Sequence, residues 1–160
     1  EVPDLDALVE EKWNKILALD PASIQPMPGV QDCVSMLHDL QIPLGVASTS
    51  RLAFIHFVLD ALHLSSSFSS LTSGEEVQHG KPAPDIYQLA AKRLGADPVQ
   101  CVAIEDAKHG VQAAVSAGLV CIGYQGDPPT QQDLSAATHR VHHFSEVDET
   151  LLQALSSSSL

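Results

Sequence analysis

The sequence predicts an α/β fold in which helices cover both faces of a parallel sheet. The main observation is three short apolar runs, each with the length and composition of a strand that is buried on both faces. These runs are IPLGVA at residues 42–47, VQCVAI at 99–104 and LVCIGY at 119–124. The second observation is that stretches with apolar residues at helical spacing separate the runs. Strands that alternate with helices in this way are typical of parallel sheets.

The predicted helices carry apolar residues on one face, which we expect to pack against the sheet. They lie at residues 4–19, 29–40, 52–62, 86–94 and around 111–115. Gly95 and Gly118 follow the last two helices and are expected to end them. A linker with Pro21, Pro26 and Pro28 separates the first helix from the rest of the chain.

The composition suits one globular domain and argues against several classes of protein. The chain has 160 residues, a size typical of a single domain. With 8 Lys and Arg against 20 Asp and Glu, its net charge is −12. This balance argues against nucleic-acid binding, because there is no excess of cations to replace counterions. No apolar run has the length of a membrane span. Cys33, Cys101 and Cys121 form no CxxC pair, so we expect no disulfide scaffold and a cytoplasmic location.

Polar residues follow the predicted strands at their carboxyl ends, where parallel sheets bind ligands. Ser48, Thr49, Ser50 and Arg51 follow the first run, Glu105 and Asp106 follow the second, and the segment GKPAPD lies at residues 80–85. Hydroxyls and helix N-termini bind anions, a lysine suits a phosphate, and adjacent carboxylates suit Mg²⁺. These residues together predict a metal-assisted phosphate site.

Three segments resemble motifs II, III and IV of the haloacid dehalogenase superfamily, in the order and spacing of its β-phosphoglucomutase-like branch. They are GVASTSR, GEEVQHGKPAPDIY and CVAIEDAKHGVQAAVSAGLVCIGY, within about residues 25–150. The resemblance implies a Rossmann-like, three-layer core. It also implies a Mg²⁺-dependent phosphatase for a small phosphorylated metabolite, with a sugar phosphate favoured and a phosphomutase as the alternative. The acidic pair favours phosphate chemistry over dehalogenation.

The resemblance also assigns roles to individual residues. It implies that Ser48 hydrogen-bonds the transferring phosphoryl group and that Lys81 neutralises the phosphate and the nucleophile. Asp106, with Glu105, is implied as the Mg²⁺ site. The segment Thr49, Ser50 and Arg51 resembles the part of sugar-phosphate members that contacts the phosphate of the substrate.

Each assignment has a purely structural alternative. Lys81 could be a solvated loop lysine, and Asp106 could do no more than cap the following helix. Ser48 could simply end a strand, and Ser50 could be only a helix cap. We interpret Trp13 as a packing residue rather than a binding platform.

The family's nucleophile is the first Asp of a DxDG[TV] motif after an apolar strand, and the second Asp is the general acid/base. Asp4 and Asp6 have the DxD spacing, but no apolar strand precedes them and Ala7 replaces the glycine. We favour their interpretation as acids at the start of a helix. Residues 1–20 are then expected to be the remnant of a helical cap, and residues 21–160 the core domain without its motif I strand.

In the family's sheet, the missing strand lies between the strands that carry motifs II and IV. We expect one of three situations: the chain is part of a longer protein, a partner chain fills the gap, or the two strands close directly. We favour the first. The 160 residues alone are then predicted to be inactive and to bind Mg²⁺ poorly. A different hypothesis is a non-catalytic phosphate-binding or interaction module.

Overall fold

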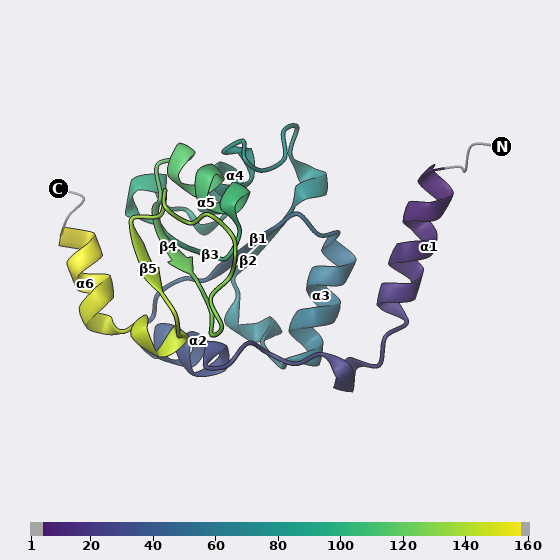
Figure 1. Cartoon of the computed structure of the whole chain (residues 1–160), viewed down its shortest axis with the longest axis horizontal. Helices are drawn as coiled ribbons and strands as arrows, with labels where there is room; N and C mark the ends of the chain where they lie inside the picture. Colours follow the sequence, from purple (N-terminus) through teal and green to yellow (C-terminus); the bar gives the residue numbers. More distant parts are fainter. Residues whose placement is uncertain (1–4, 158–160) are drawn as a thin grey trace.

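The computed structural model describes residues 5–157, with helices and strands that alternate from α2 to β4 (Figure 1). The strands are β1 (Gly45–Ser48), β2 (Ser70–Ser73), β3 (Val102–Glu105), β4 (Val120–Tyr124) and β5 (His139–Val141). The helices are α1 (Leu5–Leu17), α2 (Val30–Asp39), α3 (Leu52–Ala61), α4 (Asp85–Leu94), α5 (Lys108–Ser116) and α6 (Glu149–Ser157). Among these residues, no helix is both long and apolar enough to span a membrane.

The strands pair in parallel throughout the described residues, as the sequence predicts, but they form two sheets. One sheet pairs β1 with β2, and the other has the order β3-β4-β5. The register places Ser48 opposite Ser73 and Glu105 opposite Gly123. Because parallel strands run in one direction, their carboxyl ends lie along one edge of each sheet.

The core has two apolar layers, one on each face of the second sheet, and this confirms the three-layer α/β architecture. Neighbouring residues of β4 point to opposite faces, so Cys121 and Ile122 belong to different layers, and both are fully buried. The first layer packs residues of α4 and α5 around Cys121, including Ile86 and Val111. The second packs residues of α2 and α6 around Ile122, including Leu37.

An apolar slot of about 570 Å³ lies between β1 and β3, which do not pair with each other. Its walls come from β1, β3, α2 and α4, and they include Ala47, Ile104, Val34 and Ala90. The two strands therefore do not close directly, in contrast to one of the three expected situations. The slot also explains a wrong prediction: the strand of residues 42–47 is not buried on both faces, because β1 is only half-buried where it borders the slot.

The helices and strands begin and end at slightly different residues from those predicted. The strand predicted at 99–104 begins only at Val102, because the Asp97 carboxylate accepts a hydrogen bond from Val99 N and caps a 3₁₀ turn over Pro98–Gln100. The sequence analysis missed β2, β5 and α6. Strand β2 is the short, serine-containing sequence SLTS, which lacks the apolar run that predicts a buried strand.

Helix α1 stands away from the sheets and contacts α3 (Figure 1). The rings of Trp13 and Phe54 are 5.8 Å apart, so Trp13 is a packing residue as predicted. Asp4 and the side chain of Asp6 lie outside the described residues. The division of the chain at residue 20 into a cap remnant and a core stays a prediction.

Candidate functional site

The predicted site residues lie at the carboxyl ends of β1 and β3, on either side of the slot. Ser48 is the last residue of β1, and Glu105 is the last residue of β3. Lys81 comes from the long connection between β2 and α4 and reaches both strands. The fold thus gathers residues that are far apart in the sequence at one edge of the two sheets.

Lys81 joins the two sheets through three hydrogen bonds. Its Nζ donates to the carbonyl oxygen of Ala47 at 3.1 Å, to Tyr87 Oη at 3.3 Å and to the carboxylate of Glu105, with which it forms an ion pair. The side chains of Lys81 and Glu105 are only 11% and 9% exposed. Lys81 is therefore not a solvated loop lysine, and its charge is compensated within the protein.

Tyr87 binds the same carboxylate oxygen as Lys81, and the sequence analysis did not identify it. Its hydroxyl donates to Glu105 Oε1, and its ring lies 4.8 Å from Lys81 Nζ. Burial and the nearby Glu105 charge raise the pKa of Tyr87, so the phenol stays protonated and remains a donor. Burial, reinforced by Glu105, also raises the pKa of Cys121 to about 12, which leaves this thiol unreactive.

Gly110 of α5 leaves the space that the Glu105 carboxylate occupies. A Cβ at position 110 would lie 2.1 Å from the carboxyl carbon of Glu105. No other glycine in the described chain is approached as closely by a neighbouring side chain. The orientation of Glu105 toward Lys81 therefore depends on the absence of a side chain at this position.

Asp106 lies at the exposed rim, one residue beyond Glu105. It does not cap the following helix: Ala107 is the N-cap of α5, and no side chain of that cap residue bonds the helix. The N–H of Lys108 instead donates to Gln132 Oε1 at 3.3 Å. Within residues 5–157, no hydrogen bond or ion pair joins Asp106 to Lys81, and no group of three or more His, Cys, Asp and Glu side chains is placed to hold a metal ion.

The loop after β1 is held in a turn by its own side chains. Ser48 Oγ accepts a hydrogen bond from Ser50 N at 3.2 Å. Ser50 is not the cap of α3, because Arg51 occupies that position. Thr49 packs against Gly74, where an added Cβ would lie 3.0 Å from Thr49 Cα.

The side chain of Arg51 extends from this loop toward α1. Its guanidinium pairs with Glu10 of α1 at 2.6 Å and with Glu75 at 3.4 Å, and it lies 5.4 Å from the centre of the Trp13 ring. The substrate-binding role that the family resemblance gives to Arg51 therefore involves a side chain that already has two carboxylate partners. Lys81 and Glu105 are in direct contact, and Ser48 follows Ala47, whose carbonyl oxygen binds Lys81, whereas Arg51 pairs with carboxylates outside this cluster.

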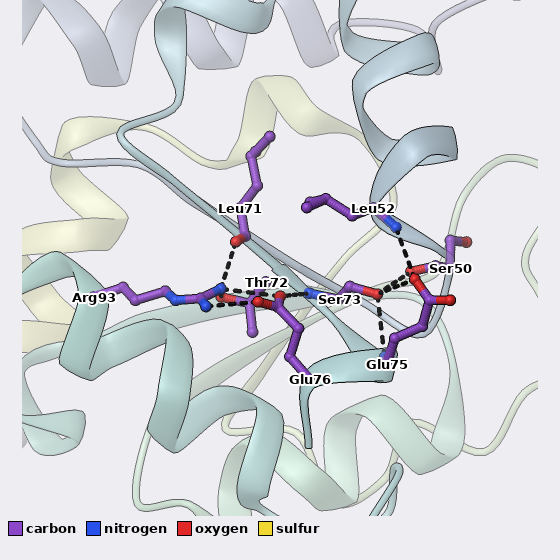
Figure 2. Close-up of polar contacts among 8 residues, drawn as sticks. All are labelled: Ser50, Leu52, Leu71, Thr72, Ser73, Glu75, Glu76 and Arg93. Atoms are coloured by element: carbon purple, nitrogen blue, oxygen red, sulfur yellow. Dashed lines mark hydrogen bonds and ion pairs between the residues drawn. The ribbon is translucent and has the colours of Figure 1, made fainter.

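A chain of polar contacts connects the same loop to the end of β2 and to α4 (Figure 2). Arg93 of α4 forms two hydrogen bonds to the Glu76 carboxylate, at 2.7 and 3.0 Å, and Glu76 accepts Ser73 N at 2.8 Å. Ser73 Oγ donates to the carbonyl oxygen of Ser50 at 2.8 Å. Glu75 accepts the N–H of Leu52 at the start of α3. Sequence reasoning missed Ser73, Glu76 and Arg93, although the GEEV segment adjoins the lysine motif.

Residues 3–118 match the family of haloacid dehalogenase-like hydrolases. The chain belongs to this family. It is 39% identical over 118 residues to the fructose-1-phosphate phosphatase YqaB of Escherichia coli (strain K12), which covers 72% of this chain and 62% of that protein. It is 37% identical over 109 residues to the beta-phosphoglucomutase of Bacillus subtilis (strain 168), which covers 68% of this chain and 47% of that protein.

A solved structure has the same fold. The crystal structure of CbbY from Rhodobacter sphaeroides in complex with phosphate superposes with a TM-score of 0.81 at 27% identity, over 92% of this chain and 67% of CbbY. The present chain spans about half to two-thirds of the length of the curated relatives, with 62% for YqaB and 47% for the phosphoglucomutase. A substantial part of each relative thus has no counterpart in these 160 residues.

The close approach of Gly110 to Glu105 predicts that Gly110→Ala destabilises this haloacid dehalogenase-like domain. The new methyl group displaces the carboxylate from Lys81 and Tyr87, at a cost of about 3 kcal/mol in the free energy of unfolding. Helix propensity alone would instead stabilise the variant by about 1 kcal/mol. Urea unfolding measures the difference. Gly80→Ala is the control, because no atom lies within 4 Å of its new Cβ, and a neutral Gly110→Ala would contradict the described position of Glu105.

The ion pair between Glu76 and Arg93 predicts a specific response to acid. Hydrogen bonds from Arg93 and from Ser73 N lower the pKa of Glu76 from 4.5 to about 2. Because this pKa is lower in the folded state, the carboxylate stabilises the fold above about pH 4.5, and the contribution is lost as the pH falls toward 2.

In Glu76→Gln, we expect a lower midpoint of thermal unfolding at pH 7 and a smaller further loss between pH 4.5 and 2.5 than in the wild type. The effect at pH 7 is expected to be roughly 1 kcal/mol or less, because the pair is partly exposed. Circular dichroism at several pH values measures it, with Asp32→Asn on the exposed face of α2 as the control. An unchanged pH dependence in Glu76→Gln would argue against the lowered pKa.

Proposed function

We propose that this chain forms the phosphate-binding core of a Mg²⁺-dependent phosphatase that acts on a small phosphorylated metabolite, with a sugar phosphate favoured. The observation that carries the proposal is the buried ammonium group of Lys81, which lies between the ends of two parallel strands. Its nearest fixed charge belongs to Glu105, so an incoming phosphate would meet a cation already held in place. The relatives named as a fructose-1-phosphate phosphatase and a beta-phosphoglucomutase support a sugar phosphate as the substrate.

Ser48 is suited to bind the phosphoryl group that is transferred. Its oxygen already accepts the N–H of Ser50, so its own proton is available for donation to a phosphoryl oxygen. We propose that Thr49 and Ser50 contact the phosphate of the substrate beside it. Arg51 would contribute after exchanging Glu10 or Glu75 for the phosphate. These local donors are needed because the net charge of −12 repels an anion at long range.

Of the acidic pair, only Asp106 is available to a Mg²⁺ ion, which would then retain most of its water ligands. Mg²⁺ sites of this kind use one or two carboxylates together with oxygens of the substrate phosphate. Asp106 is exposed at the rim and would bind the ion directly, whereas Glu105 is engaged by Lys81 and Tyr87 and would position the lysine. When bound, the ion would neutralise charge on the phosphoryl oxygens.

We propose that the nucleophile comes from polypeptide outside these 160 residues. In the haloacid dehalogenase family, an Asp carboxylate attacks the phosphorus atom, the alcohol leaves, and water then hydrolyses the aspartyl-phosphate. The slot between β1 and β3 has mostly apolar walls and is also lined by Glu105, the partner of Lys81, which suits a strand that ends in such an Asp. Residues 1–20 would then be the last part of a cap that selects the substrate. A cytoplasmic location stays a prediction from the sequence.

A phosphomutase is the second candidate, and the beta-phosphoglucomutase relative favours it. Both reactions would share the aspartyl-phosphate and differ in the acceptor, which is water in one and a second sugar phosphate in the other. Formation of an isomeric sugar phosphate rather than inorganic phosphate would identify the mutase.

Hydrolysis of p-nitrophenyl phosphate with Mg²⁺ tests the proposal, with the 160-residue chain and the full-length gene product assayed side by side. We expect turnover from the full-length product only, because the nucleophile is external to the shorter chain. Turnover by the 160 residues alone would overturn the proposed origin of the nucleophile. No turnover by either protein would favour a non-catalytic phosphate-binding module.

Replacing Lys81 tests its role in the full-length protein. Lys81→Ala is expected to lower kcat for the same substrate by about 100-fold or more, because a fixed charge at the phosphoryl group is lost. Lys92→Ala removes an exposed lysine from α4 and is the matched control. Circular dichroism at the assay temperature verifies that both variants are folded, and equal activity of the two would contradict the assignment.

A further inference from the structure

Ser73 is hydrogen-bonded to the loop that follows β1, and its side chain is fully buried. Its hydroxyl has a partner on each side, as Figure 2 shows: it donates to the carbonyl oxygen of Ser50 and accepts the N–H of Glu75 at 3.1 Å. The first of these bonds links β2 to the loop after β1, in which the N–H of Ser50 donates to Ser48 Oγ. A buried hydroxyl with both roles filled restricts the position of the groups that it binds.

Ser73 is itself fixed by groups that lie farther from the site. Its backbone N–H donates to Glu76, and Glu76 is held by the guanidinium of Arg93 (Figure 2). Arg93 also donates to the carbonyl oxygen of Leu71 at 2.7 Å. The Glu76–Arg93 pair therefore binds the backbone of β2 at Leu71 and at Ser73. The last turn of α4 is thereby connected to the loop after β1 through a continuous series of hydrogen bonds.

Glu75, the neighbour of Glu76, holds the other end of the same loop. Its carboxylate accepts the N–H of Leu52 at 3.3 Å and pairs with Arg51. The N–H of Leu52 is one of the free donors at the start of α3, so an acidic acceptor is favourable there. The segment 50–52 is therefore hydrogen-bonded at both ends, by Ser73 at Ser50 and by Glu75 at Leu52.

We propose that Ser73 is a positioning residue that fixes the backbone of Ser50 and thereby presents the Ser48 hydroxyl to a phosphoryl group. The inference rests on the proposed function, in which Ser48 donates to the phosphate. Ser73 touches no substrate and acts through Ser50, whose N–H binds Ser48 Oγ. The Glu76–Arg93 pair supports it by holding the Ser73 backbone.

Strand β2 offers a matched control for the test. Ser70, at the other end of the strand, is also buried, but its hydroxyl has no hydrogen-bond partner in the described structure. Both Ser73→Ala and Ser70→Ala therefore remove a buried hydroxyl oxygen from β2. Only Ser73→Ala also removes a hydrogen bond to the loop. Ser73→Cys, which retains a weak donor, provides a second variant with an expected intermediate effect.

The first readout is amide hydrogen exchange in the 160-residue chain. In Ser73→Ala, we expect exchange at Ser50 and Leu52 to accelerate by about tenfold or more, because the Ser50 carbonyl loses its buried donor. Exchange at Gln125, which follows β4 and whose N–H donates to the carbonyl oxygen of Val141, is expected to stay as in the wild type. Equal exchange rates at Ser50 and Leu52 in the two variants would overturn the proposal. An acceleration at Gln125 as large as that at Ser50 would also overturn it, because it would indicate general destabilisation.

The second readout is the hydrolysis of p-nitrophenyl phosphate by the full-length product. Ser73→Ala is expected to lower kcat/KM by about tenfold, and Ser70→Ala to leave it unchanged. Faster exchange at Ser50 and Leu52 in Ser73→Ala, together with an unchanged kcat/KM, would also overturn the positioning role. An inactive wild-type protein would instead refute the proposed function, while the exchange data would still decide whether Ser73 holds the loop.

Discussion

The ion pair between Lys81 and Glu105 is the interaction on which the arrangement of this domain depends. Strands β1 and β3 do not pair with each other. Lys81 connects them, because it binds the carbonyl oxygen of Ala47 in β1 and the carboxylate of Glu105 in β3. A buried charge without a partner is costly, so each of these side chains constrains the other. Tyr87 and the space left by Gly110 then fix the carboxylate in one orientation. The site therefore depends on residues of α4 and α5 as well as on the strand ends.

The sequence was most informative where apolar residues and motif residues coincide. The runs at 42–47, 99–104 and 119–124 predicted three strands, and the residues after the first two led to the strand ends where Ser48 and Glu105 lie. Parallel topology follows from the alternation of elements, because a parallel connection requires a crossover. The resemblance of three sequence motifs, in their order along the chain, separately predicted the family, which the comparisons confirm.

Other features depend on tertiary contacts that no local pattern reveals. Strand β2 is only four residues long, and three of them have hydroxyl groups, so its burial depends on α3 and α4 rather than on its own hydropathy. The buried face of α4 includes Tyr87, because its hydroxyl has a partner in Glu105. Val115 lies in the stretch predicted as an apolar helix face, yet its side chain is exposed, and α5 instead buries Gly110, Val111, Ala113 and Ala114.

The contact between Arg51 and Trp13 places an aromatic reporter next to the loop after β1. Trp13 is the only tryptophan of the 160 residues, and a guanidinium lies 5.4 Å from the centre of its ring. A cation at this distance perturbs the excited state of the indole, so the emission of the protein depends on where that guanidinium lies. The molecule thus contains its own optical probe, which would register any ligand that draws Arg51 away from the first helix.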